Sequence, residues 1–515
     1  MRKIASGFAP VIPLDRNAKK PLHRQIYEGY RKAILERHLR AGQQIPSTRA
    51  LALELGISRI PLLNAYSQLL AEGFFESRAG AGTFVANLPP DPVVRAQSRP
   101  VARANAQSGR RPVSRRSQLL PSFQPAPWIY GSGAFSVGQV AVEHFPVDTW
   151  SRLIARHSRR LHAKSAHFND PRGYREFRQA VAEYLQTARA VKCDEQQIMI
   201  VSGSQEALDL SARVLLDPGS PVWIEEPGYW LARRVLTLAG CELVPVPVDR
   251  DGLDVAAGMK LCRTARAAYV TPSHQFPLGV TMSASRRLQL LNWAQSCGAW
   301  IIEDDYDSEY RYGVTPIASL QGLDTNARVI YVGTFSKTLL PSLRVGYLVM
   351  PADLADRFMA VRVAMDIYPP HVNQAVLTDF INDGHFSRHI RRTRLLYAER
   401  REQLVQCLHN EFGSRLELMG TEAGVHLAVT LPAAIRDRPL CERAAREKLW
   451  LWPLSPCYMG KVSSRQGFIL GFGSVAAGEI PQAIRRMAAV LRPEMDARGP
   501  SDPSRRTSAP GSNEV

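Results

Sequence analysis

Gly333-Thr334-Phe335-Ser336-Lys337, with Arg344 seven residues after the lysine, is the stretch that decides how this chain is interpreted. The apolar run 329–332 precedes it and predicts a buried strand that ends at a loop. The loop presents a lysine amine, two hydroxyls and a guanidinium. A lysine amine can condense with an aldehyde to form a Schiff base, and hydroxyls with an arginine can hold a phosphate. Pyridoxal phosphate carries both groups, whereas the pentapeptide alone would rather indicate an ordinary surface turn.

The length and composition indicate a multidomain globular protein. A chain of 515 residues predicts two or three domains, and 45% hydrophobic with 22% charged residues is typical of soluble proteins. We identify no membrane-spanning stretch and no signal-peptide core, so we expect a cytoplasmic protein. The seven cysteines include no Cys-x-x-Cys pair, which argues against a disulfide framework or a zinc site. We therefore expect no metal.

Positive charge is concentrated towards the N-terminus. Residues 1–120 hold 20 Lys and Arg against 7 Asp and Glu, whereas the whole chain has a net charge of +18. A basic segment on a nearly balanced body indicates a module that binds a polyanion. Basic charge alone is weak support, because exposed lysines and arginines also keep proteins soluble.

Helical spacing and capping residues predict a winged helix-turn-helix near the N-terminus. Ser47 and Ser58 stand where helix N-caps would be, and Gly56 and Gly73 stand where the helices would end. The predicted helices cover residues 22–38, 48–55 and 59–72, and short strands cover 74–77 and 83–85 around a glycine-containing tip. The alternatives are a small helical domain with solvated arginines or a protein-protein adaptor.

The predicted third helix would enter the major groove of DNA, since it is the second member of the helix-turn-helix pair. The start of the second helix would contact phosphates, and the wing tip could enter a minor groove because glycine permits close approach. The candidate DNA-contacting residues are Ser47, Thr48, Arg49, Ser58, Arg59, Asn64, Arg78, Gly80, Gly82 and Thr83.

Composition divides the chain into four regions. Residues 1–87 form the predicted winged helix, and residues 88–133, rich in Pro, Ala, Ser and Arg, are predicted to be a flexible basic linker. The linker either adds sequence-independent DNA affinity or serves as a solubilising tether. Residues 134–490 alternate apolar runs with helical segments, which predicts an α/β domain with a mainly parallel sheet. Residues 491–515 are predicted to be a disordered tail.

Three polar stretches follow predicted strands, at the edge where such sheets bind ligands. Ser202-Gly203-Ser204-Gln205 opens a helix and could cradle a phosphate, or could be a plain serine cap. Tyr229 could stack on a flat ring or be a half-buried loop aromatic. Asp304 ends a buried strand, where a carboxylate needs a partner such as a pyridinium nitrogen, and Tyr306 would reach the ring hydroxyl. The alternative for this acidic cluster is cation ligation or helix capping.

These motifs resemble two known families. Residues 21–86, with Pro21-Leu22-His23-Arg24-Gln25-Ile26-Tyr27 and Ile45-Pro46-Ser47-Thr48-Arg49, closely resemble the GntR-type winged helix of bacterial transcription factors. Residues 134–490 resemble fold-type I aminotransferases, through motifs at residues 202–205, 226–229, 271–277, 303–307 and 334–337. The whole chain resembles the MocR subfamily of GntR regulators, in which a winged helix-turn-helix is fused to an aminotransferase-like effector domain.

The resemblance implies a pyridoxal 5'-phosphate cofactor held as an internal aldimine at Lys337, the catalytic residue. It implies stacking by Tyr229, a pyridine-nitrogen salt bridge to Asp304 and a ring-oxygen contact from Tyr306. The phosphate contacts that it implies come from Ser204, Gln205, Thr334, Ser336 and Arg344. The full set of cofactor-binding residues is Gly203, Ser204, Gln205, Tyr229, Asp304, Tyr306, Thr334, Ser336, Lys337 and Arg344. A homodimer, domain-swapped through the linker, is also expected.

Several departures from the family patterns bear on function. Ile469 stands where working aminotransferases have the arginine that clamps a substrate carboxylate, and a hydrocarbon cannot replace that clamp. Phe276 replaces an asparagine, Phe168 replaces a tyrosine, and residues 60–64 depart from the usual polar start of the recognition helix.

The expected function is a transcriptional regulator that senses pyridoxal phosphate or an amino compound, with a slight preference for the vitamer or an amine without a carboxylate. Partial transamination is expected rather than sustained turnover. The alternatives are an aminotransferase with a fused regulatory DNA-binding domain, and a domain that serves only for dimerisation.

Overall fold

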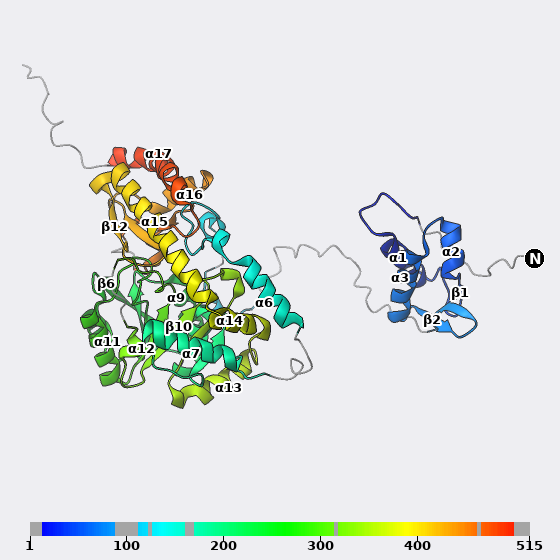
Figure 1. Ribbon diagram of the computed structural model, residues 1–515, viewed down its shortest axis with the longest axis horizontal. Coiled ribbons are helices and arrows are strands. Elements are labelled where there is room, and N and C mark those ends of the chain that lie inside the picture. Colours follow the sequence, from blue (N-terminus) through cyan, green and yellow to red (C-terminus); the bar gives the residue numbers. More distant parts are fainter. Residues whose placement is uncertain are drawn as a thin grey trace, which may run out of the picture. The chain divides into compact units, whose positions relative to one another are not determined.

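The structure, a computed structural model, describes residues 13–87, 112–121, 126–159, 169–313, 318–460 and 465–498. The chain divides into two compact units, Met1–Pro112 and Val113–Val515 (Figure 1). The predicted linker therefore overlaps the second unit, and two short helices, α4 (Arg115–Gln118) and α5 (Pro127–Tyr130), lie within its sequence. Residues 88–111 and 122–125 of the predicted linker lie outside the described residues. No described helix is long and apolar enough to cross a membrane.

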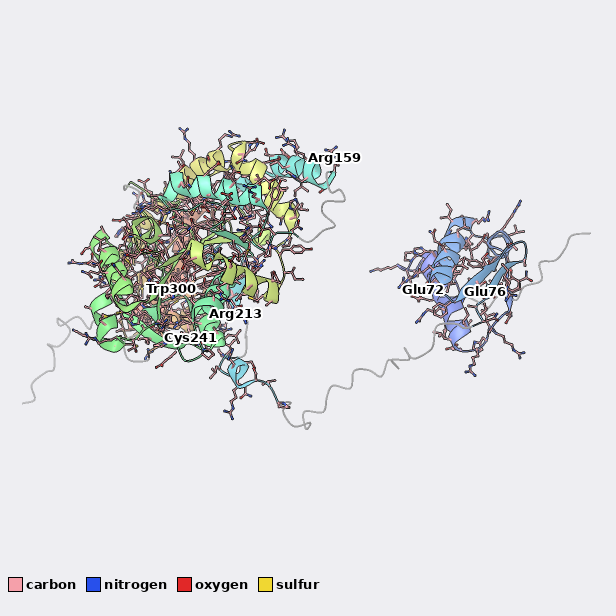
Figure 2. The ribbon with its side chains drawn as sticks, turned by 90° about the horizontal axis from the view of Figure 1, so that it is seen from below. Glu72, Glu76, Arg159, Arg213, Cys241 and Trp300 are labelled. Carbon is pink, nitrogen blue, oxygen red and sulfur yellow. The ribbon has the colours of Figure 1, made fainter. Side chains whose placement is uncertain are left out.

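The small unit contains the three helices and the hairpin predicted from sequence. They are α1 (Leu22–Leu35), α2 (Thr48–Leu55), α3 (Arg59–Ala71), β2 (Phe75–Arg78) and β3 (Gly82–Val85). Glu72, at the end of α3, and Glu76, on β2, mark the two sides of the turn between them (Figure 2). One strand was not predicted: β1 (Gln44–Ile45) pairs antiparallel with β3, and two residues are too few to give an alternating pattern.

Buried aromatic side chains hold the helices of the small unit to its wing. The rings of Tyr30, Tyr66 and Phe75 meet edge to face, with centroids 5.6, 5.4 and 5.2 Å apart. The Tyr66 hydroxyl also donates to the Pro46 carbonyl oxygen at 3.0 Å, directly before α2. Each ring pair contributes about 1 kcal/mol beyond its buried area. These contacts fix α1, α3, the wing and the start of α2 as one body.

Ser47→Ala is expected to lower the local stability of α2 by about 1 kcal/mol. The Ser47 side chain accepts a hydrogen bond from the Ala50 amide at 3.2 Å and so caps the helix. Ser58 stands at the corresponding position of α3, but its side chain makes no capping hydrogen bond, contrary to the sequence-based expectation. Ser58→Ala is therefore the matched control. Hydrogen exchange of the α2 and α3 amides measures both variants, and equal losses would contradict this account.

Eight strands form the central sheet of the larger unit. They are β4 (Ile198–Val201), β5 (Pro221–Glu226), β6 (Glu242–Asp249), β7 (Gly252–Leu253), β8 (Ala267–Val270), β9 (Trp300–Asp305), β10 (Val329–Thr334) and β11 (Gly346–Val349). Their spatial order is β4-β11-β10-β9-β8-β5-β6-β7. The strands β10, β9, β8, β5 and β6 run parallel to one another. β11 runs antiparallel to both of its neighbours, β10 and β4, and β7 runs antiparallel to β6. The predicted mainly parallel α/β sheet is confirmed, although β6 and β7 were not predicted.

Helices cover both faces of this sheet (Figure 1). They are α7 (Arg175–Arg189), α8 (Ser204–Leu215), α9 (Trp230–Ala239), α10 (Val255–Leu261), α11 (Ala284–Cys297), α13 (Ala355–Met365), α14 (His371–Asn382) and α15 (His385–Phe412). Ile330 and Val332 pack in one apolar cluster with α8, α9 and α13, whereas Tyr331, between them, packs with α7, α14 and α15. Strands buried on both faces are apolar throughout, which explains why the sequence shows continuous runs rather than alternation.

A second, antiparallel sheet follows in the chain and was not predicted. Its strands are β12 (Glu417–Met419), β13 (His426–Thr430), β14 (Trp452–Pro453) and β15 (Gly467–Gly471), in the order β12-β13-β15-β14. The remaining helices are α6 (Val147–Arg159), α12 (Leu320–Leu323), α16 (Asp437–Arg446) and α17 (Ile480–Arg498). Helix α17 continues through Leu491 and Met495, which are buried, so the predicted tail boundary at 490 is wrong.

Candidate functional site

One cavity of about 180 Å³ in the larger unit is lined by all the residues that the sequence predicted to bind a cofactor. These are Gly203, Ser204, Gln205, Tyr229, Asp304, Tyr306, Thr334, Ser336, Lys337 and Arg344. Further lining residues that the sequence analysis did not assign to the site include Gly138, Tyr269, Phe276, His426 and Trp452. The structure therefore brings together side chains separated by more than 200 positions in the sequence.

Sheet topology explains why these residues meet. β9 and β10 are parallel neighbours, with Asp304 opposite Val332 and Asp305 opposite Gly333. The segment with Lys337 follows β10, and Ser204 begins α8 shortly after β4. Because the carboxyl ends of these strands lie at one edge of the sheet, the loops that follow them converge there.

Asp304 is a buried carboxylate with only hydroxyl partners. Its Oδ1 accepts from Ser204 Oγ at 3.1 Å, and its Oδ2 accepts from the Tyr269 hydroxyl at 2.8 Å. Burial raises the pKa of Asp304 to about 6, although the two hydroxyls lower it. A buried carboxylate is costly unless it gains a positive partner, so this position suits a protonated ring nitrogen.

Lys337 reaches the cavity from the loop after β10. Its Nζ donates to the Gly138 carbonyl oxygen at 3.2 Å, and a Cβ at Gly138 would lie 2.7 Å from that nitrogen. Burial lowers the pKa of the Lys337 amine, while Asp307 and Asp304 oppose the shift. A lower pKa increases the fraction of neutral amine, which is the form that attacks a carbonyl carbon.

The opposite end of the cavity suits a phosphate. Helix α8 begins at Ser204, so its free amides face this end. The Arg344 guanidinium lies against Gly203, where an added Cβ would come within 3.3 Å of its nitrogen. Thr334 Oγ1 and Ser336 Oγ lie 3.1 Å apart on the loop before Lys337. Helix amides, hydroxyls and a guanidinium are the donors that bind a phosphate, so this donor set and Asp304 together fit pyridoxal phosphate.

The two predicted site tyrosines and the positions that depart from the aminotransferase pattern lie in different surroundings. Tyr229 packs edge to face on Phe276, with centroids 5.3 Å apart. The Tyr306 hydroxyl, expected to reach a ring oxygen, donates to the His274 carbonyl oxygen at 2.8 Å in this structure. Ile469 is fully buried in an apolar cluster with Phe276 and does not line the cavity. Phe168 lies outside the described residues.

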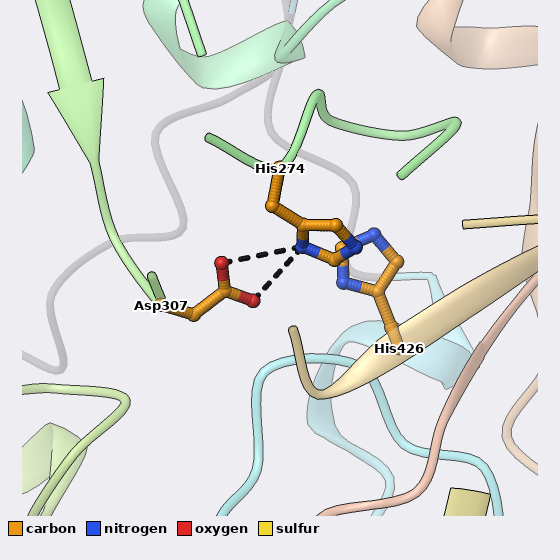
Figure 3. A group of neighbouring side chains, drawn as sticks. All are labelled: His274, Asp307 and His426. Atoms are coloured by element: carbon orange, nitrogen blue, oxygen red, sulfur yellow. Dashed lines mark hydrogen bonds and ion pairs between the residues drawn. The ribbon is translucent and has the colours of Figure 1, made fainter. Parts of the chain in front are cut away.

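A cluster of His274, Asp307 and His426 lies beside the cavity (Figure 3). The Asp307 oxygens lie 3.2 and 3.0 Å from His274 Nδ1, and all three side chains are buried. The sequence predicted no histidine cluster, because its three residues lie far apart in the chain: His274 follows β8, Asp307 follows β9 and His426 begins β13. The available signal was that residues 274 and 307 each follow a strand, and that β8 and β9 are neighbours.

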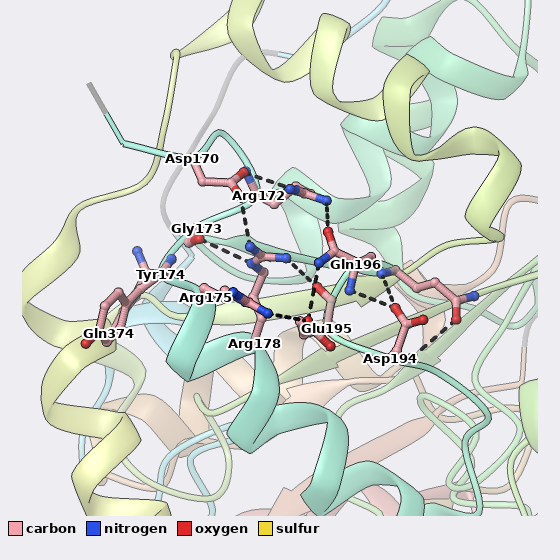
Figure 4. Close-up of polar contacts among 11 residues, drawn as sticks. Asp170, Arg172, Gly173, Tyr174, Arg175, Arg178, Asp194, Glu195, Gln196 and Gln374 are labelled. Atoms are coloured by element: carbon pink, nitrogen blue, oxygen red, sulfur yellow. Dashed lines mark hydrogen bonds and ion pairs between the residues drawn. The ribbon is translucent and has the colours of Figure 1, made fainter. Parts of the chain in front are cut away.

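A second polar cluster fixes the loop that precedes α7 (Figure 4). The fully buried Arg178 donates to Asp170 at 2.8 Å and to the Gly173 carbonyl oxygen at 3.2 Å. The Arg172 carbonyl oxygen in turn accepts from the Ile200 amide at 2.8 Å. This cluster holds the loop on the sheet and lines no part of the cavity.

The small unit exposes most of the predicted DNA-contacting residues. Thr48 and Thr83 are half-buried. The other eight residues are exposed: Ser47, Arg49, Ser58, Arg59, Asn64, Arg78, Gly80 and Gly82. Arg59 Nε donates to Thr48 Oγ1 at 3.0 Å. Arg78 pairs with Glu76 and lies over the Phe84 ring, 4.4 Å from its centroid. Arg78 is thus held on the wing in this structure.

Cofactor affinity is expected to fall as the pH drops below about 6, by up to about tenfold per unit. The raised pKa means that Asp304 is protonated in the free protein below this pH, and the proton must leave before the carboxylate accepts from the ring nitrogen. Titrating the cofactor-free protein with pyridoxal phosphate across this range measures the effect. The Asp304→Asn variant should bind the cofactor weakly, and its affinity should show no step near pH 6. A step that persists in the variant would come from the phosphate, whose second pKa is also about 6.

Comparisons with known proteins agree with both halves of this description. Residues 22–85 match the bacterial regulatory proteins of the gntR family, and residues 134–466 match aminotransferase class I and II. The chain is 40% identical to the "probable rhizopine catabolism regulatory protein MocR" of Rhizobium meliloti, over 97% of this chain and 99% of that protein. It is 30% identical to the pyridoxine biosynthesis transcriptional regulator PdxR of Corynebacterium glutamicum, over 90% of this chain and 95% of that one.

Solved structures support the fold of the larger unit. The multiple substrate aminotransferase of Thermococcus profundus matches 75% of this chain and 98% of its own, with a TM-score of 0.68 and 27% identity. Class I and II aminotransferases use pyridoxal phosphate, so these matches imply the cofactor that the donor set of the cavity fits.

Proposed function

Because the chain belongs to the MocR subfamily of GntR-type transcriptional regulators, we propose that it is a pyridoxal-phosphate-dependent regulator of transcription. Its small unit binds an operator in double-stranded DNA, and its larger unit senses pyridoxal phosphate or an amino compound at Lys337. One observation carries the proposal. Lys337, Asp304 and Arg344 line a single cavity in a chain that also contains a winged helix.

Each residue of the cavity has a separate task in this proposal. Pyridoxal phosphate, when bound, supplies a reactive aldehyde and an electron-withdrawing ring. The Lys337 amine, kept partly neutral by burial, is the nucleophile for that aldehyde. Asp304 would hold the proton on the ring nitrogen, and Arg344 with the α8 amides would neutralise the phosphate. Tyr229, which lines the cavity, would cover the ring and exclude water from it.

Two observations favour a regulator over an aminotransferase with a fused DNA-binding domain. Relatives named as regulators match the chain over nearly its whole length, winged helix included. Ile469 lies on β15, and the resemblance to aminotransferases implies that it replaces their carboxylate-binding arginine. The second observation also supports the vitamer, or an amine without a carboxylate, as the signal. The name of the Corynebacterium relative, a regulator of pyridoxine biosynthesis, supports the vitamer.

A ligand can change DNA binding only if it has different affinities for two arrangements of the protein. We propose that these are arrangements of a domain-swapped homodimer in the cytoplasm, where the operator is. Closed two-fold assemblies are the commonest oligomers, and a dimer would match a repeated operator. The arginines between residues 88 and 133 would add sequence-independent affinity for the phosphates.

The experiment that tests the proposal measures binding to DNA taken from upstream of the gene. Fluorescence anisotropy should show specific binding, with a dissociation constant of about 10⁻⁸ M or lower at physiological salt. Arg59→Ala should weaken it by at least about tenfold, because Arg59 is exposed at the start of α3. Arg213→Ala, on the exposed side of α8, is the matched control (Figure 2). Equal affinity for upstream and unrelated DNA would contradict the proposal.

A further inference from the structure

We infer that a second cavity of the larger unit binds a small organic anion with two negative charges, such as a dicarboxylate or a phosphate ester. Arg311, Arg391 and Arg394 hold the charges of this anion. The second cavity is separate from the one at Lys337, since the two have no described lining residue in common. The anion site therefore does not depend on the proposed cofactor.

Three segments that are distant in the sequence form this second cavity, which has a volume of about 590 Å³. They are the last turns of α7, the loop that follows β9 and the first turns of α15. The volume is within the range of small-molecule sites. Ile390 and the rings of Tyr184 and Phe386, which meet edge to face with centroids 5.2 Å apart, make part of the wall apolar. An apolar wall suits the carbon skeleton of an organic ligand.

The polar part of the second cavity has an excess of positive charge. Four arginines line it, whereas Glu309 is the single carboxylate among its described lining residues. One arginine, Arg189, is already paired, because its guanidinium lies 2.8 Å from Asp305. The other three form no ion pair with any described residue: Arg311, Arg391 and Arg394. Guanidinium groups that converge on a cavity in this way bind carboxylates and phosphates.

Glu309 does not balance these charges. Its carboxylate accepts from the Tyr184 hydroxyl at 2.8 Å, and burial together with Asp305 raises its pKa to about 7, so it is partly protonated at neutral pH. Arg394 Nε donates to the backbone carbonyl oxygen of Glu309 at 2.9 Å, which orients the guanidinium without neutralising it. Burial and the nearby Arg189 charge lower the pKa of Arg311, although Asp305 opposes the shift. The arginines therefore lack a permanent counter-charge.

Helix α15 presents two of these arginines on one face. Arg391 and Arg394 stand three positions apart, which makes them neighbours on the helix surface. No acidic residue stands three or four positions from either of them, so the helix itself supplies no ion pair. The helix begins at His385, and the positive end of its dipole is therefore at the cavity. An anion that contacts both guanidiniums relieves the repulsion between them.

The shape of the site favours a small ligand over the phosphate backbone of DNA. Arg391 and Arg394 are exposed and a duplex could reach them. Arg311, however, is half-buried, and its guanidinium lies 3.4 Å from the Ser273 carbonyl oxygen. Phe386, which lines the same cavity, is 1% exposed. A ligand that contacts all three arginines must therefore enter the cavity, as a small anion can.

The test measures the binding of matched probes to the full-length protein by isothermal titration calorimetry at constant ionic strength. Succinate and glycerol 3-phosphate are the doubly charged probes, and their relative affinities distinguish a carboxylate ligand from a phosphate ligand. Butyrate has the four carbons of succinate but a single charge. Succinate should bind at least about tenfold more tightly than butyrate, the usual effect of one hydrogen bond between charged groups.

Substitutions on α15 locate the site. Arg391→Gln and Arg394→Gln should each weaken the binding of the tighter doubly charged probe by at least about tenfold. Both side chains are exposed, so the fold should survive, and the melting temperature checks this. Arg392→Gln is the matched control, because Arg392 is exposed on the same helix, donates to the His144 carbonyl oxygen and does not line the cavity.

Three outcomes would overturn the inference. The first is that neither doubly charged probe binds, or that succinate binds no more tightly than butyrate. The second is an equal loss of affinity in Arg392→Gln and in the two cavity variants. The third is weaker binding of unrelated DNA by Arg391→Gln with no change in probe binding, which would assign this arginine to DNA. A protein that takes up no pyridoxal phosphate would instead contradict the proposed function and leave the anion site unaffected.

Discussion

Lys337→Ala is expected to abolish the visible absorption band that the protein gains with pyridoxal phosphate. Lys337 is the single lysine among the described residues that line the cavity, so no second amine there can attack the aldehyde. The substitution removes one hydrogen bond, from Nζ to the Gly138 carbonyl oxygen at 3.2 Å, and the fold should survive. An absorption titration measures the loss, and the melting temperature checks the fold.

Lys260→Ala is the matched control for this prediction. Lys260 is exposed on α10, in the same unit as Lys337 but away from the cavity, so its loss should leave the band unchanged. Borohydride reduction followed by peptide mass mapping would locate the attachment site independently. A band of undiminished strength in Lys337→Ala, or a cofactor fixed to another lysine, would contradict the assignment.

Arg189→Met is expected to destabilise the larger unit by about 3–5 kcal/mol, the usual cost of leaving a buried ion-pair partner alone. Arg189 and Asp305 are 5% and 6% exposed, and the Arg189 Nε lies 2.8 Å from Asp305 Oδ2. The same carboxylate oxygen accepts from the Tyr331 hydroxyl at 2.6 Å. Methionine fills the space but leaves the Asp305 charge uncompensated next to Asp304, so cofactor affinity should fall as well.

Tryptophan fluorescence during guanidinium unfolding measures this loss, because all eight tryptophans lie in the larger unit. Arg213→Met is the control, since Arg213 is exposed and pairs with the half-buried Asp209 on α8, so its loss should change stability by less than about 1 kcal/mol. If both variants lose the same free energy of unfolding, the Arg189–Asp305 pair does not stabilise the end of β9 as we describe.

The sequence predicted those parts of the fold whose signal is local. The runs 198–201 and 329–332 are short, apolar and buried on both faces, and the motifs at residues 202–205 and 333–337 follow them directly. Because parallel strands end at one edge, placing the strands also placed Lys337 near Asp304. The strand ends therefore predicted that Lys337 and Asp304 lie close together, whereas Gly138, Tyr269, Phe276, His426 and Trp452 were not assigned to the site.

The features that the sequence analysis missed depend on contacts between distant segments. β12 and β14 contain three and two residues, too few for a periodic signal. The His274–His426 contact joins two sheets, and neither residue has a local pattern that marks it. The predicted tail begins too early because Pro493, a residue type that normally ends a helix, lies inside α17.

The most direct test of the central claim is the operator affinity of the full-length protein with and without pyridoxal phosphate, in the unsubstituted protein and in Lys337→Ala. We expect the cofactor to change the affinity of the unsubstituted protein by at least about fivefold, the lower end of typical coupling between two sites. The affinity of Lys337→Ala should not respond. An unsubstituted protein that binds the cofactor at Lys337, yet binds DNA equally well in both states, would contradict the account.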